Sequence, residues 1–507
     1  MLTLSIFIPN VGTVNIVRDM RLGRRDEARQ PLRQPMMTEA DIPSDTAPAD
    51  MLVRQRVGFI ASGAPPIEER LADLARLKKA ILALRPQFEE AISADFGNRS
   101  RFETAIMEIM PVTQGIDYLR RHLRRWMRPQ SRHVALQFRP ARAKVMMQPL
   151  GVVGIVSPWN YPLALCLTPL ATALAAGNRV MIKPSEYTPR TSALMARMLA
   201  DIFPEDQVAI VIGGPDVGAA FSALPFDHLC FTGSTGIGKA IMRAASENLV
   251  PVTLELGGKS PAIVADDYSI PRAAKALVYG KLSNAGQTCV APDYALVPEV
   301  KVEALASAYE AEVRRAYPQG LADKDYASLI SQRHHDRLVG LIEDARVKGA
   351  RIVQIGAKPD LGLPTTLAPT IVLGATPDMK IMQEEIFGPV LPVVAFRSVE
   401  DAIARINAGD RPLALYVFSN RQEVVDKVLT STTSGSAVVN DTILQFAQDD
   451  LPFGGVGASG MGAYHGEEGF RTFSHAKGVF VQSRLSMAGM MRAPFGALAD
   501  RVLRFIL

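Results

Sequence analysis

The stretch VVGIVSPWNYPLALCLTPLATALAAGNRVMIK (152–183) decides the fold class, because two short apolar runs lie on either side of a helical segment. The runs VVGIVS and RVMIK lack polar alternation, as expected of strands that are buried on both faces of a parallel sheet. Three similar runs follow further helical stretches: QVAIVIG (207–213), HLCFTG (228–233) and PVTLEL (251–256). This alternation predicts βαβ units and therefore an α/β fold with a doubly wound parallel sheet.

A second α/β region is predicted from about residue 256 to 445, with a helical pattern over 299–317 and a strand-like run over 414–419. With 507 residues, the chain is too long for one core, and we expect two or three domains. Upstream, an amphipathic helix is predicted by apolar residues at helical spacing, namely Leu71, Leu74, Leu77, Ile81 and Leu82. Pro86 interrupts this pattern, and a second helical pattern continues to Gly97.

The composition is typical of a soluble globular protein, with 48% hydrophobic and 21% charged residues. Basic residues gather in RRHLRRWMRPQSR (120–132), which we interpret as a solvated, partly interfacial helix. No zinc-finger spacing or RNA-recognition signature accompanies it, so no nucleic-acid partner is expected. Three cysteines give no disulfide framework and favour a reducing, cytoplasmic compartment. No uninterrupted run of 18 apolar residues occurs, so no integral membrane segment is expected.

The two ends of the chain carry weaker patterns. Residues 1–50 show few helical or strand patterns, and we expect a poorly ordered extension there. The apolar segment 2–17 precedes its arginines, which is the wrong order for a signal peptide, and Met36 or Met37 is an alternative start. Residues 485–507 mix apolar residues with arginines at helical spacing. That pattern suits a helix on a membrane surface or one packed on its own protein, and we favour the second.

Two glycine-rich turns compete for a dinucleotide, which is the natural ligand of a doubly wound sheet. GVGASG (455–460) has the G-x-G-x-x-G spacing, but no βαβ unit accompanies it, so we interpret it as a packing loop. FTGSTGIGKAIM (231–242) is the better candidate, because a strand precedes the glycines and the N–H groups of a following helix can meet a phosphate. Lys183 and Glu186 lie at the same sheet edge, where they can hold the hydroxyls of an adenosine ribose or form a surface ion pair.

Cys289 is the candidate nucleophile, because it lies in the open, glycine-marked stretch NAGQTCVAPDY (284–294). Glu255 ends a predicted strand beside a glycine pair, and we expect this carboxylate to be exposed to a cleft. Asn160 follows another strand, and its amide can donate a hydrogen bond to an oxyanion. Glu255 and Asn160 alone are more often structural, and Cys289 alone is equally well explained as a small buried hydrophobe. Together they supply a thiol, a base and a donor. No histidines have metal-ligand spacing, and no metal is expected.

Seven segments resemble, in order, the motif set of the NAD(P)-dependent aldehyde dehydrogenase superfamily: SPWNYPL, IKPSE, FTGSTGIGK, LELGGKSP, NAGQTCVAPDY, QEEIFGPVLPV and LPFGGVGASGMGAYHG. The resemblance covers roughly residues 50 to 485, and the separation of Glu255 from Cys289 also fits the family. Residues 439–475 look most like the class 3 and coniferyl-aldehyde branch. We therefore expect the aldehyde dehydrogenase fold.

The resemblance implies a three-part architecture. Residues 51–132 and 150–255 would form a Rossmann-like cofactor domain, and residues 256–445 a catalytic domain. Two separated segments, 133–149 and 476–488, would form a small oligomerisation element, and a homodimer is the usual state of the branch. Residues 446–475 would return past the site, and residues 489–507 would form a tail.

The resemblance also implies roles for individual residues. Cys289 would be the nucleophile and Glu255 the base, while Asn160 and the backbone N–H of Cys289 would hold the oxyanion. Lys183 and Glu186 would meet the adenosine ribose of NAD, with NADP as an alternative. Glu385 would hold the nicotinamide ribose, and Phe387 would pack near the nicotinamide ring. The other implied cofactor-binding residues are Trp159, Ser185, Gly214, Gly233, Ser234 and Gly238.

The expected reaction is oxidation of an aldehyde to the acid through a thiohemiacetal and a thioester on Cys289. We expect local donors and the cationic nicotinamide to lower the pKa of this thiol. Two alternatives are a CoA-acylating aldehyde dehydrogenase and a cofactor-binding protein with a dead site. The substrate is expected to be a coniferaldehyde-type aromatic aldehyde or a medium- to long-chain aliphatic one. Candidates for an apolar tunnel, which core packing would equally explain, are Trp159, Tyr161, Leu165 and Phe446.

Overall fold

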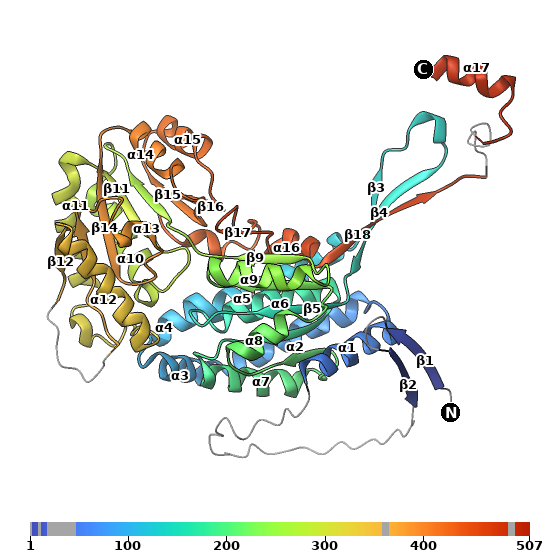
Figure 1. The fold of residues 1–507 in the computed structure, drawn as a ribbon, viewed down its shortest axis with the longest axis horizontal. Helices are drawn as coiled ribbons and strands as arrows, with labels where there is room; N and C mark the ends of the chain where they lie inside the picture. The colour runs from blue at the N-terminus through green and yellow to red at the C-terminus, as the bar shows by residue number, and fades with distance from the viewer. Residues whose placement is uncertain (1–2, 9–11, 18–46, 357–364, 485–491, 507) are drawn as a thin grey trace. The chain divides into compact units, whose positions relative to one another are not determined.

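The computed structural model describes residues 3–8, 12–17, 47–356, 365–484 and 492–506 (Figure 1). The chain divides into two units, Met1–Pro43 and Ser44–Leu507. In the first unit, strands β1 (Thr3–Ile8) and β2 (Gly12–Val17) pair antiparallel. The expectation of few strand patterns before residue 50 is wrong over these segments, because both contain β-branched residues that fit a pleated strand. Residues 18–46 of the expected extension lie outside the described residues.

The second unit contains a six-stranded sheet that confirms the predicted doubly wound fold (Figure 1). Its strands, in spatial order, are β17 (Gly460–Met461), β9 (Val252–Glu255), β8 (His228–Thr232), β5 (Val152–Val156), β6 (Arg179–Lys183) and β7 (Val208–Ile210). Strands β5 to β9 are the five predicted runs and are parallel, whereas β17 is antiparallel to β9. The chain order reverses at β5, and ligands bind at such a switch point, beyond the carboxyl ends of the strands.

Helices connect and cover these strands. The crossover helices are α6 (Ala164–Ala176), α7 (Pro189–Ile202), α8 (Pro215–Ser222) and α9 (Thr235–Ser246). Helices α1 (Pro48–Ser62), α2 (Ile67–Ala83), α3 (Arg85–Phe96) and α5 (Met110–Trp126) precede the sheet in sequence. As predicted, Leu74, Leu77 and Ile81 of α2 are buried and α3 ends before Gly97, whereas Leu82 is exposed.

The basic helix predicted over residues 120–132 is shorter than expected. Helix α5 ends at Trp126, and residues Gln130–Arg132 form strand β3. Pro129 lies between the two elements, and the residue before a proline is disfavoured in the helical conformation. The arginines of this segment therefore lie at a helix end, in the short connection that contains Arg128, and in a strand.

A seven-stranded sheet forms the second α/β region. Its spatial order is β12 (Arg351–Gln354), β13 (Thr370–Leu373), β14 (Val390–Phe396), β11 (Tyr294–Pro298), β10 (Pro261–Val264), β15 (Ala414–Phe418) and β16 (Ser436–Val439). All neighbours are parallel except β12 and β13. The associated helices are α10 (Ile270–Leu282), α11 (Val302–Ala316), α12 (Gln332–Val347), α13 (Lys380–Gln383), α14 (Val399–Asn407) and α15 (Gln422–Ser431). The predicted helix over 299–317 and strand over 414–419 are thus present.

A third sheet joins two segments that are far apart in sequence. Strand β4 (Arg142–Pro149) lies between β3 and β18 (Ser474–Val481), and both pairings are antiparallel. Ser474 is opposite Pro149 and Val481 is opposite Arg142. Phe480 and Val481 are exposed on this sheet, and its role in oligomerisation stays a prediction.

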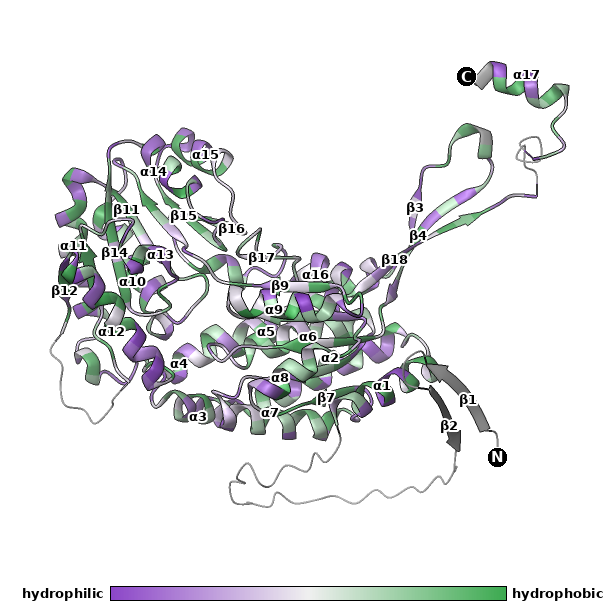
Figure 2. Ribbon diagram, in the orientation of Figure 1, coloured by the Kyte–Doolittle hydropathy of each residue, from purple (hydrophilic) through white to green (hydrophobic). Residues whose placement is uncertain are grey.

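The hydropathy of the residues differs between the sheets and the helices that cover them. Figure 2 shows hydrophobic colours along the central strands of the seven-stranded sheet and mixed colours on outer helices such as α12.

Helix α17 (Ala497–Ile506) carries Arg501 and Arg504, and its Leu498 and Leu503 are exposed. Within the described parts of the chain, no helix is both long and apolar enough to cross a membrane.

Candidate active site

Cys289 lies just after a strained turn that follows α10. Asn284 and Ala285 have φ values of 52° and 50°, and Gly286 has 75°. A side chain at Gly286 would overlap the carbonyl oxygen of Gly388, which explains the glycine. Backbone strain of this kind is concentrated at functional sites. Cys289 is partly exposed, whereas Cys166 and Cys230 are buried, so Cys289 is the accessible thiol of the three.

The protein's own groups do not activate this thiol. Its enclosure, followed by the carboxyl groups of Glu385 and Glu255, raises the pKa of Cys289 to about 12. The N–H groups of Cys289 and Val290 act in the opposite direction but are outweighed. The local donors therefore act in the expected direction, but burial and nearby negative charge outweigh them because both disfavour a thiolate. The expected effect of the cationic nicotinamide stays a prediction.

Glu255 is buried at the end of β9, with only 2% of its surface exposed. The expectation that it faces an open cleft is therefore wrong, because the loop containing Gly454 covers it: a Cβ at Gly454 would lie 3.1 Å from Oε1 of Glu255. Neither carboxyl oxygen has a hydrogen-bond partner in the described structure. Burial raises the pKa of Glu255 well above its usual value. A carboxyl group with a raised pKa is a stronger base than an exposed one and is therefore suited to accept a proton.

Asn160 lies in the loop after β5, at the switch point of the sheet. Its side-chain Nδ2 donates to the carbonyl oxygen of Gln287 at 3.0 Å, two residues before Cys289. The neighbouring Tyr161 hydroxyl is 2.7 Å from Oγ1 of Thr288. An asparagine amide has a second N–H, which can donate to a developing oxyanion. The fold thus brings the predicted donor to the predicted nucleophile from more than a hundred residues away.

Lys183 and Glu186 lie together at the carboxyl end of β6. Nζ of Lys183 is 3.9 Å from Oε2 of Glu186 and donates to the carbonyl oxygen of Pro184 at 2.7 Å. Burial lowers the pKa of Lys183, and Glu186 opposes that effect. Ser185, which lies between them in sequence, is buried, and its Oγ accepts a hydrogen bond from the N–H of Tyr187 at 3.3 Å. A half-exposed carboxylate beside a buried ammonium is suited to vicinal hydroxyls.

The glycine-rich turn after β8 leads directly into α9. Ser234 is the residue before this helix, and its hydroxyl makes no capping hydrogen bond, so it is free to meet a ligand. A Cβ at Gly233 would lie 2.5 Å from the ring of Phe231, and one at Gly238 would lie 2.7 Å from Leu256. These glycines therefore allow close packing of the turn and of α9. Gly214 precedes α8 and has open space where a Cβ would lie. The combination fits a dinucleotide phosphate at the start of α9.

Glu385 and Phe387 come from the second α/β region, in the loop after α13. The Glu385 carboxyl lies so close to Gly257 that a Cβ there would overlap it. Burial, and then Asp293, raises the pKa of Glu385 to about 8. Phe387 has a left-handed φ of 52°, and its ring is 5.4 Å from that of Trp159, edge to face. A loop after β5 of the six-stranded sheet and a loop before β14 of the seven-stranded sheet are thus in contact at the predicted cofactor site.

Two residues that support this loop were missed by sequence reasoning. Asp293 accepts a hydrogen bond from the N–H of Ile386 at 2.9 Å, and Lys259 forms an ion pair with Asp293. Lys259 also donates to the carbonyl oxygens of Ile381 and Glu384, at 2.8 and 2.9 Å. Both residues lie in quoted motifs, LELGGKSP and NAGQTCVAPDY, and a charged residue in each was the available signal.

The predicted tunnel residues divide into two groups. Tyr161 and Leu165 are buried in the helical core, whereas Trp159 and Phe446 are partly buried. Phe446 lies 5.1 Å from the ring of Phe453 and 5.2 Å from that of His465. His465 belongs to the same group of rings, and its buried Nε2 has no hydrogen-bond partner within the described ranges. No cluster of three or more metal-ligating side chains occurs in this part of the chain either.

Comparison with known proteins agrees with this geometry. The Aldehyde dehydrogenase family matches residues 52–479. A protein named "Probable coniferyl aldehyde dehydrogenase" from Pseudomonas aeruginosa is 52% identical over 446 residues, covering 88% of this chain and 93% of that protein. The substrate-bound state of Staphylococcus aureus AldH superposes with a TM-score of 0.85 at 36% identity, covering 90% of this chain and 99% of that one.

A Mycobacterium tuberculosis aldehyde dehydrogenase complexed with NAD+ has a TM-score of 0.78 at 30% identity, covering 87% of this chain and 91% of that one. The family model spans most of the chain, and the relative's identity extends over nearly all of both proteins. The chain therefore belongs to the aldehyde dehydrogenase family, whose members are enzymes that oxidise aldehydes with NAD(P).

Proposed function

We propose that this enzyme oxidises a coniferaldehyde-type aldehyde to its carboxylic acid with NAD+ through a thioester on Cys289. The observation that carries the mechanism is the hydrogen bond of 3.0 Å between Asn160 and the carbonyl of Gln287, which ties an oxyanion donor to the turn before the thiol. In this mechanism the thiolate of Cys289 attacks the aldehyde carbon. Asn160 and the N–H of Cys289 hold the resulting oxyanion, a role in which each donor is typically worth about 3–4 kcal/mol.

The residues of the candidate cofactor site fit the cofactor. Lys183 and Glu186 would hold the adenosine ribose, the N-terminus of α9 the phosphates, and Glu385 the second ribose. When bound, the cofactor supplies a hydride acceptor. Glu255 then takes a proton from the water that attacks the thioester. The buried, unpartnered carboxyl of Glu255 supports this role, because its raised pKa makes the carboxylate a stronger base.

The choice of an aromatic substrate is supported by the name of the Pseudomonas aeruginosa relative and by the rings of Phe446, Phe453 and His465. Medium- and long-chain aliphatic aldehydes are the second candidate class. The test is reduced-cofactor formation with coniferaldehyde, benzaldehyde and a long-chain aldehyde, each with NAD+ and NADP+. Turnover that is fastest with coniferaldehyde supports the proposal, and a preference for the aliphatic substrate contradicts it.

The same assay separates the alternatives. A CoA-acylating enzyme would turn over only when CoA is added, but a buried carboxyl at Glu255 favours hydrolysis by water. Silence under both conditions would indicate a cofactor-binding protein without activity.

We further propose a cytoplasmic homodimer, in which β18 and β4 would contribute to the interface. Light scattering of the purified protein tests the oligomeric state.

The cofactor should control the reactivity of Cys289. We expect alkylation of the protein alone to accelerate only toward the raised pKa of about 12, and its pH profile to move to lower pH when NAD+ is added. A cationic nicotinamide near the thiol favours the thiolate, which opposes the effect of Glu385 and Glu255. Mass spectrometry of iodoacetamide-treated protein, over about pH 6 to 11, measures the profile. Identical profiles with and without NAD+ would contradict this explanation.

Glu186 should favour NAD+ over NADP+. Its carboxylate would repel a 2′-phosphate on the adenosine ribose, so Glu186→Gln should improve the ratio of kcat/KM for NADP+ to that for NAD+ by about tenfold, equivalent to roughly 1.4 kcal/mol. The matched control is Glu205→Gln, an exposed carboxylate at a salt bridge with Arg54. An unchanged ratio in Glu186→Gln would remove Glu186 from the ribose site.

A further inference from the structure

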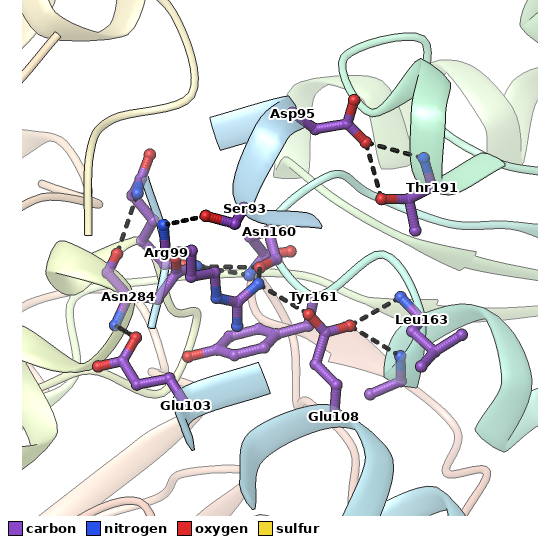
Figure 3. Close-up of polar contacts among 12 residues, drawn as sticks. Ser93, Asp95, Arg99, Glu103, Glu108, Asn160, Tyr161, Leu163, Thr191 and Asn284 are labelled. Atoms are coloured by element: carbon purple, nitrogen blue, oxygen red, sulfur yellow. Dashed lines mark hydrogen bonds and ion pairs between the residues drawn. The ribbon is translucent and has the colours of Figure 1, made fainter. Parts of the chain in front are cut away.

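Arg99 forms a fully buried ion pair with Glu108 beside the candidate active site (Figure 3). Arg99 lies between α3 and the short helix α4 (Arg101–Thr104), and Glu108 lies in the π-helical turn Ala105–Ile109. Nη1 of Arg99 donates to Oε1 of Glu108 at 2.7 Å, and neither side chain is exposed at all. Neither residue belongs to the catalytic motifs in the sequence.

Both members of the ion pair hold the loop that carries Asn160. Nη1 of Arg99 also donates to the carbonyl oxygen of Asn160 at 3.1 Å. Oε2 of Glu108 accepts hydrogen bonds from the N–H groups of Leu163 at 2.7 Å and Ala164 at 3.1 Å, at the start of α6. The loop is therefore held at Asn160 and again three and four residues later.

The held loop meets the Cys289 turn through three hydrogen bonds. The carbonyl of Asn160 accepts a second hydrogen bond from Nδ2 of Asn284 at 2.9 Å. The side chains of Asn160 and Tyr161 contact Gln287 and Thr288, as described above. The guanidinium of Arg99 lies 4.7 Å from the centre of the Tyr161 ring. Arg99 therefore holds the backbone of Asn160, and the position of the Asn160 side chain relative to the Cys289 thiol depends on that hydrogen bond.

Stability alone is a poor explanation for this ion pair. Burying two charges removes both from water, and apolar replacements of such pairs are often neutral or stabilising. Arg99 also leaves Nε and Nη2 buried without a hydrogen-bond partner among the described residues. Departures of this kind from the usual rules of polar burial are expected at functional sites.

We propose that Arg99 is a positioning residue for the oxyanion formed at Cys289. By holding the carbonyl of Asn160, while Glu108 holds the other end of the loop, Arg99 keeps the Asn160 amide where the tetrahedral oxyanion will lie. The inference rests on the proposed function, in which Asn160 donates to that oxyanion. Position matters because such donors act at about 2.7–3.1 Å, and a displaced donor loses most of its effect.

A double-mutant cycle tests this inference in the full chain. Arg99→Met, Asn160→Ala and the double variant are compared by the rate of the first burst of reduced cofactor. Arg99→Met should slow the burst about 10²-fold in the wild-type background, comparable to losing one oxyanion donor. In the Asn160→Ala background, Arg99→Met should slow the burst less than about threefold. The reason is that Arg99 acts by positioning the Asn160 amide, and that variant has already lost the hydrogen bond from the amide to the oxyanion. Cofactor affinity should stay within about twofold, and Arg99→Lys should recover part of the rate.

Equal losses of burst rate in the wild-type and Asn160→Ala backgrounds, or a matching loss of cofactor affinity, would show that Arg99 has only a structural role. Either result would overturn the inference. If Arg99→Met fails to fold, the near-isosteric Glu108→Gln replaces it, with a loss of about tenfold expected in the wild-type background and none in Asn160→Ala. The matched control is Arg101→Met, an exposed arginine two residues away. A wild-type enzyme without aldehyde turnover, or a Cys289→Ser variant that retains turnover, would instead refute the proposed function.

Discussion

Cys289→Ser is expected to lower kcat/KM for every aldehyde by about 10⁴-fold or more, since removal of a nucleophile eliminates the covalent route. A serine hydroxyl ionises far less readily than a thiol. It would also meet the enclosure and the two carboxyl groups that already raise the pKa of Cys289. The measurement is steady-state formation of reduced cofactor, with thermal unfolding to show that the variant is folded.

The control for this variant is Cys166→Ala. Cys166 is fully buried in helix α6, away from solvent, and the change removes a thiol without touching the turn at Cys289. It should retain most of the activity and lose a modest amount of stability through the small cavity left behind. Retention of more than about 1% of the turnover by Cys289→Ser would show that the reaction does not proceed through this residue.

Glu255→Gln should separate the two halves of the reaction. The first turnover should produce a burst of about one reduced cofactor per Cys289, and later turnovers should be slower by about 10²- to 10⁴-fold, because no base activates the hydrolytic water. Removing the carboxyl also removes one of the groups that raise the pKa of Cys289, so the burst itself should not slow. Stopped-flow absorbance of reduced cofactor resolves both phases.

The pH dependence of the wild type supports the same assignment. Because burial raises the pKa of Glu255, the carboxylate form is lost as pH falls through that raised value, and thioester hydrolysis should decline well above pH 4.5. Glu255→Gln should lack this acid limb, while the exposed Glu247→Gln should keep it. A burst that slows together with turnover in Glu255→Gln would place Glu255 in activation of the thiol instead.

The parallel strands were predictable because both faces of each strand are buried, so that apolar residues follow one another without polar alternation. VVGIV, RVMIK and HLCFT contain few polar residues, and the structure places all three in the six-stranded sheet. The candidate site residues Cys289, Glu255 and Asn160 could also be selected from the sequence, because each chemical group lies at the end of a strand or in a glycine-marked turn.

What escaped prediction depends on contacts across the fold. The partners of Arg99 and Glu108 lie some fifty to sixty residues further along the chain, and nothing local in the sequence indicates an ion pair. The burial of Glu255 depends on Gly454, which is distant in sequence, so a strand-end glutamate looked exposed. The pKa of Cys289 likewise depends on Glu385, whose position relative to the thiol only the fold defines.

The pairing of β17 with β9 has a consequence for synthesis of the chain. Gly460 and Met461 cover the outer edge of the strand that carries Glu255. Until those residues have left the ribosome, the nascent domain presents an uncovered strand edge, and such edges template aggregation. A frameshift or nonsense mutation shortly before codon 460 should therefore yield an insoluble product instead of a weakly active one, although Asn160, Glu255 and Cys289, the residues proposed for catalysis, have already been made.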